Sequence, residues 1–147
     1  VMEELGALRQ VMVWNKSSMV MGHSDYHYKH EPILYGWKPG AAHYFTPDRT
    51  KTTVLDFDRP QRNGEHPTMK PIPLWGELMG NSSRNGEIVI DPFSGSGTTM
   101  VTAEQIGRKA RCMELDPKYC QVIVNRMLTL NPEIVVKKNG IEYVPKS

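Results

Sequence analysis

Residues 87–99, Glu-Ile-Val-Ile-Asp-Pro-Phe-Ser-Gly-Ser-Gly-Thr-Thr, decide the fold class of this chain. The unbroken apolar run that ends at Asp91 is typical of a buried parallel strand. A glycine-rich loop follows, and residues 98–106 have the pattern of a helix that stops at Gly107. In open α/β sheets, the loop beyond the carboxyl end of such a strand is where ligands bind. The stretch therefore predicts a strand–loop–helix unit with a ligand site in its loop.

Helical and strand patterns continue on both sides of this unit. Residues 71–81 carry apolar residues at helical spacing, residues 110–114 have the pattern of the next strand, and residues 117–130 that of a further helix. Two strands joined by a crossover helix favour a parallel sheet. We therefore expect residues 65–130 to form a ligand-binding α/β unit.

The rest of the chain is expected to add short strands to that unit. Within residues 1–38, two runs rich in β-branched and aromatic residues, 10–15 and 32–38, predict an antiparallel strand pair. In the tail, residues 131–147, Asn139-Gly140 between two apolar runs predicts a small hairpin. Together the elements predict one α/β domain with three layers, helix, sheet and helix.

Composition limits the function classes without choosing one. The chain has 147 residues, which suits one domain, and a formal net charge of +2, which by itself does not indicate nucleic-acid binding. Cys112 and Cys120 lack CxxC spacing and fit a reducing compartment. No stretch approaches the roughly 18–20 apolar residues of a membrane span, and no signal peptide is visible. We expect a cytoplasmic protein with no membrane contact.

Three kinds of ligand compete for the loop after Asp91. A phosphate-binding P-loop needs lysine after its last glycine, but Thr98 follows Gly97. A dinucleotide fingerprint needs a third glycine or alanine where Met100 stands. A nucleoside without phosphate fits better, because Glu114, about 20 residues further on, can accept hydrogen bonds from ribose hydroxyls. S-adenosylmethionine is such a ligand, and Asp91 can accept from its ammonium group; a turn without any ligand is the alternative.

Four segments, in one order, resemble the motifs of DNA amino-methyltransferases, which methylate adenine N6 or cytosine N4. They are His30-Glu-Pro-Ile-Leu-Tyr-Gly-Trp37, His66-Pro-Thr-Met-Lys-Pro71, Asp91-Pro-Phe-Ser-Gly-Ser-Gly-Thr98 and Glu114-Leu-Asp-Pro-Lys-Tyr119. The resemblance covers most of residues 10–127 and implies a partial Rossmann-like fold that uses S-adenosylmethionine, with Glu114 on the ribose. The cofactor-binding residues that it implies are Asp91, Pro92, Phe93, Ser94, Gly95, Gly97, Thr98, Thr99, Glu114, His66, Thr68 and Lys70.

One motif of that family is missing from the sequence. The family holds the flipped base with Asp/Asn/Ser-Pro-Pro-Tyr/Phe, whose polar groups accept the amine hydrogens and whose ring stacks on the base. The dipeptides Asp91-Pro92, Asp116-Pro117 and Asn131-Pro132 all lack the second proline. In the group that this chain resembles, the motif precedes the first residue, Val1. We therefore expect the C-terminal part of a longer enzyme, with no catalytic residue of its own and inactive alone.

The missing strand has a physical consequence. Without it, an apolar sheet edge beside the cofactor strand is left unpaired. We expect this edge to bind the missing N-terminal half of the enzyme or a second copy of the chain.

Aromatic and basic residues in the first half are the candidates for contact with double-stranded DNA. Residues 39–64, irregular apart from a short strand predicted near 53–57, are the candidate target-recognition segment. Rings can stack on a flipped base or its neighbours, and basic groups can bind phosphates. A loop folded over the sheet, with its aromatic rings in the core, is the alternative. The DNA-binding candidates are Tyr26, His27, Tyr28, Arg49, Lys51, Arg59 and Arg62.

A metal site is the alternative role for the cluster His23, Asp25, His27, His30 and Glu31, whose side chains are compatible with zinc. Neither HExxH nor CxxC accompanies the cluster, and the family resemblance involves no metal. We expect no metal at this position.

The predicted function is site-specific DNA methylation, in which an exocyclic amine of a DNA base receives a methyl group from S-adenosylmethionine. Adenine is favoured over cytosine on the frequency of the two within the family, and the setting is a bacterial or phage restriction–modification system. The alternative is a non-catalytic module that binds S-adenosylmethionine or DNA. A methyltransferase acting on RNA or on small molecules fits the motifs less well.

Overall fold

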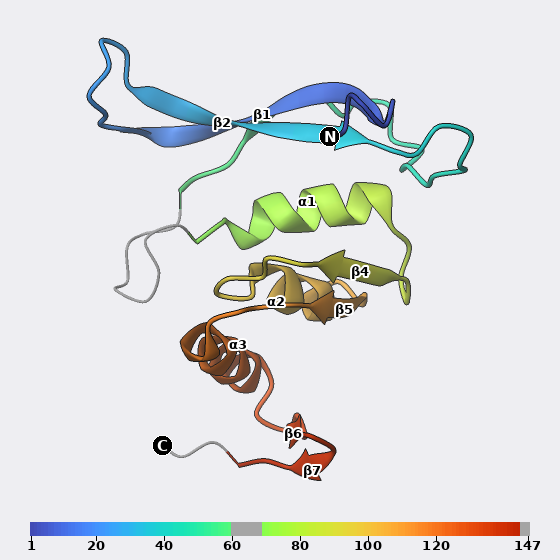
Figure 1. The fold of residues 1–147 in the computed structure, drawn as a ribbon, viewed down its shortest axis with the longest axis vertical. Helices are drawn as coiled ribbons and strands as arrows, with labels where there is room; N and C mark the ends of the chain where they lie inside the picture. The colour runs from blue at the N-terminus through green and yellow to red at the C-terminus, as the bar shows by residue number, and fades with distance from the viewer. Residues whose placement is uncertain (60–68, 145–147) are drawn as a thin grey trace.

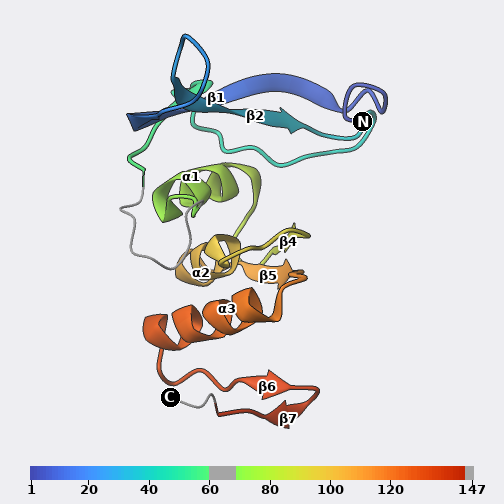
Figure 2. The same cartoon turned by 60° about the vertical axis from the view of Figure 1, so that its left-hand side comes forward.

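The computed structural model describes residues 1–59 and 69–144, and these residues stack in layers along the long axis of the molecule (Figure 1). A three-stranded sheet lies at the N-terminal end, and helix α1 (Ile72–Ser82) lies next to it. The following layers hold the β4–α2–β5 unit, then α3, then a small hairpin at the C-terminal end. Figure 2 shows the same order from a second side.

In the first sheet the central strand is β1 (Leu8–Val20). It pairs antiparallel with β2 (Tyr28–Gly36) and parallel with the short β3 (Val54–Asp56). The predicted strand pair is confirmed, but β1 is longer than residues 10–15. The polar residues after Asn15 do not suggest a strand, and pairing with β2, through a bulge between Asn15 and Val20, overrides their low β propensity.

Helix α1 packs between the first sheet and α2. It begins after Pro71 with proline in its first turn, as predicted, and it buries Leu74 and Met79. The loop before β3 is tied to the last turn of α1, where the backbone N–H of Thr46 donates to the carbonyl of Asn81 at 2.8 Å. Because α1 lies between them (Figures 1 and 2), the first sheet and the second sheet share no strand pairing within the described ranges.

The second sheet consists of β4 (Ile88–Asp91) and β5 (Lys109–Cys112), which run parallel and are joined through α2 (Thr98–Gln105). Their register sets Asp91 opposite Cys112, so the two carboxyl ends lie side by side. The predicted parallel α/β unit is therefore confirmed. Strand β5 begins and ends earlier than the predicted 110–114, a difference within the usual uncertainty of element boundaries.

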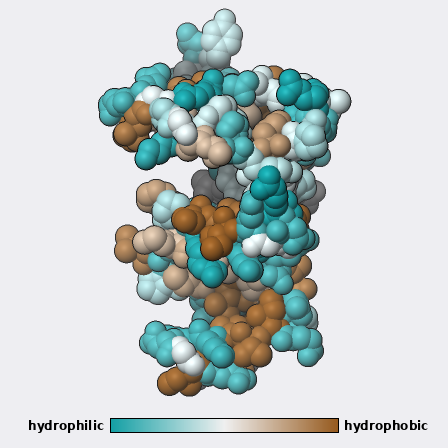
Figure 3. All heavy atoms as spheres, turned by 90° about the vertical axis from the view of Figure 1, so that its right-hand side faces the viewer, coloured by the Kyte–Doolittle hydropathy of each residue, from teal (hydrophilic) through white to brown (hydrophobic). Residues whose placement is uncertain are grey.

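The face of the second sheet that carries Ile88 and Ile90 is uncovered among the described residues. Alternate side chains of β4 point to opposite faces, and those of Ile88 and Ile90 are 58% and 72% exposed. In Figure 3, hydrophobic residues gather at the height of β4 and β5. The α/β class is as predicted, and this face of the second sheet is open in the described part of the chain.

Helix α3 (Pro117–Leu130) and the tail complete the structure. The carboxylate of Asp116 caps the helix by accepting from the backbone N–H of Lys118 at 2.8 Å. Strands β6 (Lys137–Lys138) and β7 (Ile141–Glu142) form the predicted hairpin, with Asn139 and Gly140 both at positive φ as a tight turn requires. None of the helices in the described part is long and apolar enough to cross a lipid bilayer.

Candidate functional site

The loop between β4 and α2 is built so that only glycine fits at its end. Gly97 has a φ of +80°, and a Cβ there would lie 2.6 Å from the Cγ1 of Ile123 on α3. The backbone N–H of Ser94 donates to the carbonyl of Met113 at 2.9 Å and holds the loop against the end of β5. The loop is thus pressed between β5 and α3, with its open side at the carboxyl ends of the two strands.

Asp91, the last residue of β4, is oriented by three elements. One carboxylate oxygen accepts from the backbone N–H of Phe93 at 3.0 Å, and the other accepts from the hydroxyl of Thr99 at 2.6 Å. The indole N–H of Trp75, on α1, donates to that same Thr99 hydroxyl at 2.8 Å. This chain of hydrogen bonds fixes the carboxylate at the mouth of the loop.

Glu114 lies just beyond β5 and contacts the loop from the other side. Its carboxylate accepts from the backbone N–H of Gly95 at 2.6 Å and from that of Asp116 at 2.9 Å. The N–H of Asp116 and then that of Gly95 hold the pKa of Glu114 below its ordinary value. An ionised carboxylate has about four acceptor sites, so Glu114 retains capacity for the hydroxyls of a ligand.

A cavity of about 290 Å³ opens at this loop. Phe93, which lines it, is 89% exposed, and Leu115, the residue after Glu114, is 98% exposed. An acidic side chain at each of two neighbouring strand ends, with apolar surface beside them, suits a nucleoside that also carries an ammonium group. The lining residues are Met69, Lys70, Trp75, Asp91, Phe93, Ser94, Gly95, Ser96, Thr98 and Thr99.

Most of the cofactor-binding residues predicted from the sequence surround this cavity. Glu114 reaches the loop through Gly95 without lining the cavity, Gly97 lies on the far side against α3, and Pro92 is exposed in the turn. His66 and Thr68 lie outside the described residues. The predicted residues that line it are Asp91, Phe93, Ser94, Gly95, Thr98, Thr99 and Lys70.

Lys70 takes part in an ion cluster that the sequence does not reveal. Its ammonium bonds one oxygen of Glu31, on β2, and the ammonium of Lys16, on β1, lies 2.8 Å from the other oxygen. Both ammonium groups also lie over the ring of Trp14, at 5.5 and 5.2 Å from its centroid. The sequence alone indicates only that Trp14 and Lys16, two residues apart in a strand, lie on the same face of it.

Glu31 is therefore a partner of lysines, although its spacing suggested a possible metal ligand. Burial raises the pKa of Glu31, but the hydrogen bonds from Lys16 and Lys70 outweigh this effect and hold it below its ordinary value. Across residues 1–59 and 69–144, no three His, Cys, Asp or Glu side chains are grouped so that they could hold a metal ion.

The DNA-binding candidates fall in different places. Tyr26, which is 90% exposed, and Tyr28 lie at the end of the β1–β2 hairpin, and the ring of neighbouring His27 accepts from the backbone N–H of Gly22 at 3.4 Å. Lys51 bridges Asp48 and Glu77 at 3.3 and 2.8 Å, which fastens its loop to α1. The remaining three differ: Arg49 is exposed, Arg59 lines a separate cavity, and Arg62 lies outside the described residues.

Comparison with known sequences gives a consistent set of relatives. The family model described as "DNA methylase" matches residues 1–125. The type II methyltransferase M2.DpnII of Streptococcus pneumoniae is 29% identical over 132 residues, which are 79% of this chain and 49% of that protein. M2.MboI of Moraxella bovis is 28% identical over 120 residues, 71% of this chain and 43% of that protein. The chain spans about half the length of these relatives.

Solved structures share the fold. The complex of M1.HpyAVI with S-adenosylmethionine superposes with a TM-score of 0.73 at 24% identity, covering 86% of this chain and 65% of that one. The protein TTHA0409 of Thermus thermophilus, complexed with S-adenosyl-L-methionine, gives a TM-score of 0.68 at 26% identity, covering 90% of this chain and 58% of that one. The cytosine-N4-specific PvuII DNA methyltransferase gives 0.68 at 20% identity, covering 86% and 54%. The Rossmann-like fold predicted from the sequence is thereby confirmed.

Proposed function

Because the chain belongs to the DNA methylase family, we propose that it binds S-adenosylmethionine at the β4–α2 loop and serves DNA methylation on an exocyclic amine. The observation that carries this proposal is the pair of carboxylates, Asp91 and Glu114, hydrogen-bonded to the glycine-rich loop from two neighbouring strand ends.

The ribose, the ammonium and the adenine of the cofactor each have a counterpart in this chain. Glu114 would accept hydrogen bonds from the ribose hydroxyls, and Asp91 would accept from the ammonium of the methionine part. Phe93 and Leu115 would cover the adenine with apolar surface, since both side chains are exposed. The bound cofactor supplies an activated methyl group. The chain's own contribution is to hold that cofactor in one orientation, and orientation is a large part of what such a reaction requires.

The methyl acceptor we propose is the exocyclic amine of a flipped base in double-stranded DNA, with adenine N6 favoured over cytosine N4. Extruding the base is needed because the amine is not accessible in the stacked helix. Tyr26, His27 and Tyr28 at the hairpin end would stack against DNA, and Arg49, Arg59 and Arg62 would meet phosphates. Such an enzyme acts on DNA in the cytoplasm of a bacterium or of a phage-infected cell.

We propose further that the 147-residue chain does not transfer methyl groups alone. No Asp/Asn/Ser-Pro-Pro-Tyr/Phe tetrapeptide occurs in its sequence, so it lacks the polar acceptor and the ring that hold the target base. Among the described residues, one edge of β4 is unpaired, and with the exposed side chains of Ile88 and Ile90 it forms a surface to which the strand carrying that motif could add. The same absence favours a second candidate function, a non-catalytic module that binds S-adenosylmethionine or DNA.

Ligand titration tests the cofactor assignment. We expect isothermal titration calorimetry to detect binding of S-adenosylmethionine by the chain, and much weaker binding of ATP or NAD, because the loop has neither the lysine nor the third small residue that those ligands need. Preference for ATP or NAD, or no binding of S-adenosylmethionine, contradicts the proposal.

Transfer of radioactive methyl groups to DNA separates the two functions. We expect no transfer by the chain alone, and transfer once a polypeptide carrying the Asp/Asn/Ser-Pro-Pro-Tyr/Phe tetrapeptide is added. Bound cofactor without transfer under both conditions favours the non-catalytic module.

A further inference from the structure

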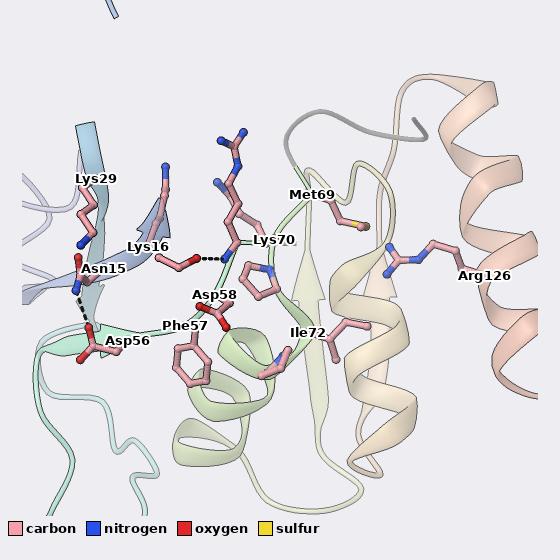
Figure 4. A pocket seen from close by; sticks show the side chains of 14 residues that line it. Asn15, Lys16, Lys29, Asp56, Phe57, Asp58, Met69, Lys70, Ile72 and Arg126 are labelled. Atoms are coloured by element: carbon pink, nitrogen blue, oxygen red, sulfur yellow. Dashed lines mark hydrogen bonds between the residues drawn. The ribbon is translucent and has the colours of Figure 1, made fainter. Parts of the chain in front are cut away.

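A second cavity, of about 660 Å³, lies between the first sheet, the start of α1 and α3 (Figure 4). It is separate from the loop cavity but shares Met69 and Lys70 with it. Its walls come from β1, β2, the residues after β3, the residues before α1, and α3. Five cationic side chains line it: Lys16, Lys29, Arg59, Lys70 and Arg126.

Positive charge exceeds negative charge in this cavity. Two carboxylates, Asp56 and Asp58, are among the lining residues, and Asp56 accepts from the side-chain amide of Asn15 at 2.6 Å. Glu31 adds one more carboxylate behind the wall. The described residues thus bring five cations against three acids at one place, although the whole chain carries a net charge of only +2.

Lys16 is the most buried of these cations, and its charge lies within the folded structure and not on a solvated surface. The side chain of Lys16 is only 6% exposed, and removing an ammonium from water is costly unless it is paired. Lys16 must share the single carboxylate of Glu31 with Lys70, with Trp14 beneath both. Two ammonium groups with one carboxylate between them leave a positive charge at the cavity wall for a further anion.

We propose that this cavity binds a backbone phosphodiester of the DNA strand whose base is to be methylated, an inference that rests on the proposed function. Lys16, Lys70 and Glu31 together carry one excess positive charge, and a phosphodiester carries one negative charge. Cations from several elements are the usual partners of backbone phosphates. The apolar side chains of Phe57, Ile72 and Pro73 line the same cavity and suit the adjoining sugar better than a free inorganic anion.

The position of the cavity gives this contact a purpose. In Figure 4, Lys16 and Lys29 lie on the side of the first sheet and Arg126 extends from α3 on the opposite side. Arg126 also donates to the carbonyl of Ser96, within the cofactor loop, at 2.7 Å. A phosphate held here fixes the strand next to the loop cavity. Contacts to phosphates carry no sequence information, so the cavity positions the strand and does not select its sequence.

The carboxylate of the cofactor is the competing anion, because Lys70 lines both cavities. Two observations favour the phosphodiester. The Lys70 ammonium is directed to Glu31, on the first sheet, and Lys29 and Arg59 line only the second cavity. Variants of Lys29 and Arg59 therefore distinguish binding of a phosphodiester from binding of the cofactor carboxylate, and they leave Lys16, Glu31 and Lys70 unchanged.

The test uses the complete chain and a fluorescein-labelled 12-mer DNA, as single strand and as duplex, in anisotropy titrations from about 50 to about 200 mM KCl. For Lys29→Ala/Arg59→Ala we expect about tenfold weaker binding at low salt. Each phosphate contact contributes roughly −0.9 to the slope of log affinity against log salt concentration. Loss of one or two contacts should therefore make the slope shallower by about 1–2. Lys109→Ala, at the opposite end of β5 from the loop, is the matched control, and Lys29→Arg/Arg59→Lys should restore most of the affinity.

The outcomes separate this inference from the proposed function. Equal slopes for the double variant and the Lys109→Ala control, or no DNA binding by the wild-type chain, overturn the cavity assignment while cofactor binding stands. Loss of S-adenosylmethionine binding in the double variant also overturns it, because the cavity would then serve the cofactor. Circular dichroism of each variant verifies folding.

Discussion

At the scale of single residues, the site depends on carboxylates whose oxygens are already engaged by backbone N–H groups. Glu114 joins the loop after β4 to the turn before α3, and Asp91 joins the same loop to α1 through Thr99 and Trp75. Such hydrogen bonds set the direction of each carboxylate before a ligand arrives, which reduces the ordering cost of binding.

Replacing Glu114 tests this arrangement. Glu114→Gln keeps the shape but removes the charge and turns one acceptor into a donor that faces a backbone N–H. We expect affinity for S-adenosylmethionine to fall at least about tenfold, roughly the loss of one charged hydrogen bond, in calorimetric titrations. Glu104→Gln, an exposed change on α2, should bind like the wild type. Equal affinities for both variants would remove Glu114 from the site.

Glu31 leads to a prediction about how the stability of the fold depends on pH. Its pKa is lowered in the folded state, so its contribution to stability is present above the ordinary value of 4.5 and is lost as the pH falls through the lower folded value. We expect Glu31→Gln to be less stable than the wild type at neutral pH, because Lys16 loses its carboxylate. Urea unfolding should show the difference shrinking below about pH 4.5. Glu133→Gln, an exposed control, should show no such convergence, and a constant gap for Glu31→Gln would contradict the assignment.

At the scale of elements, the hydrophobic spacing of the sequence was enough to predict each helix in the described ranges and the parallel pairing of β4 with β5. The signals were local: proline in the first turn of α1 and α3, and glycine at the ends of the loops. The length of β1 and the pairing of β3 with it could not be predicted, because both depend on strands that are distant in sequence and on a polar stretch without alternation.

Gly86 and Gly97 have the same φ of +80°, so their alanine variants distinguish the cost of backbone strain from the cost of overpacking. At Gly86 an added Cβ meets open space, whereas at Gly97 it would meet Ile123 on α3. We expect Gly86→Ala to cost about 1 kcal/mol of the free energy of unfolding, from the left-handed backbone alone. Gly97→Ala should cost about 2–4 kcal/mol, because overpacking adds to the strain. Urea denaturation measures both, and equal costs would mean that α3 does not press on the loop.

At the scale of the whole molecule, two sheets stand apart with α1 between them, and one face of the second sheet is open in the described part of the chain. The sequence predicted the order of the elements and a ligand site at the loop after β4, since both predictions follow from local motifs. It did not predict the Lys16–Glu31–Lys70 cluster, because its members come from three segments with no shared motif.

The open face predicts self-association. We expect the wild-type chain to form dimers or larger species as its concentration rises in sedimentation velocity, because the unpaired edge of β4 and the Ile88 and Ile90 side chains favour pairing. Ile90→Lys should shift the chain towards monomer, and Ile141→Lys, on the exposed tail hairpin, should not. A monodisperse wild-type monomer at all concentrations would contradict this prediction.

Two indole groups lie where the two proposed ligands bind. The ring N–H of Trp75 donates to Thr99 at the loop cavity, and that of Trp14 donates at 2.8 Å to the carbonyl of Phe57, a residue that lines the second cavity. In a nitrogen–proton correlation spectrum, each indole gives its own resonance, sensitive to its hydrogen bond. Cofactor bound at the loop should shift the Trp75 indole resonance, and a phosphodiester bound in the second cavity should shift that of Trp14. One sample of the wild-type chain can therefore report the order in which the two ligands bind.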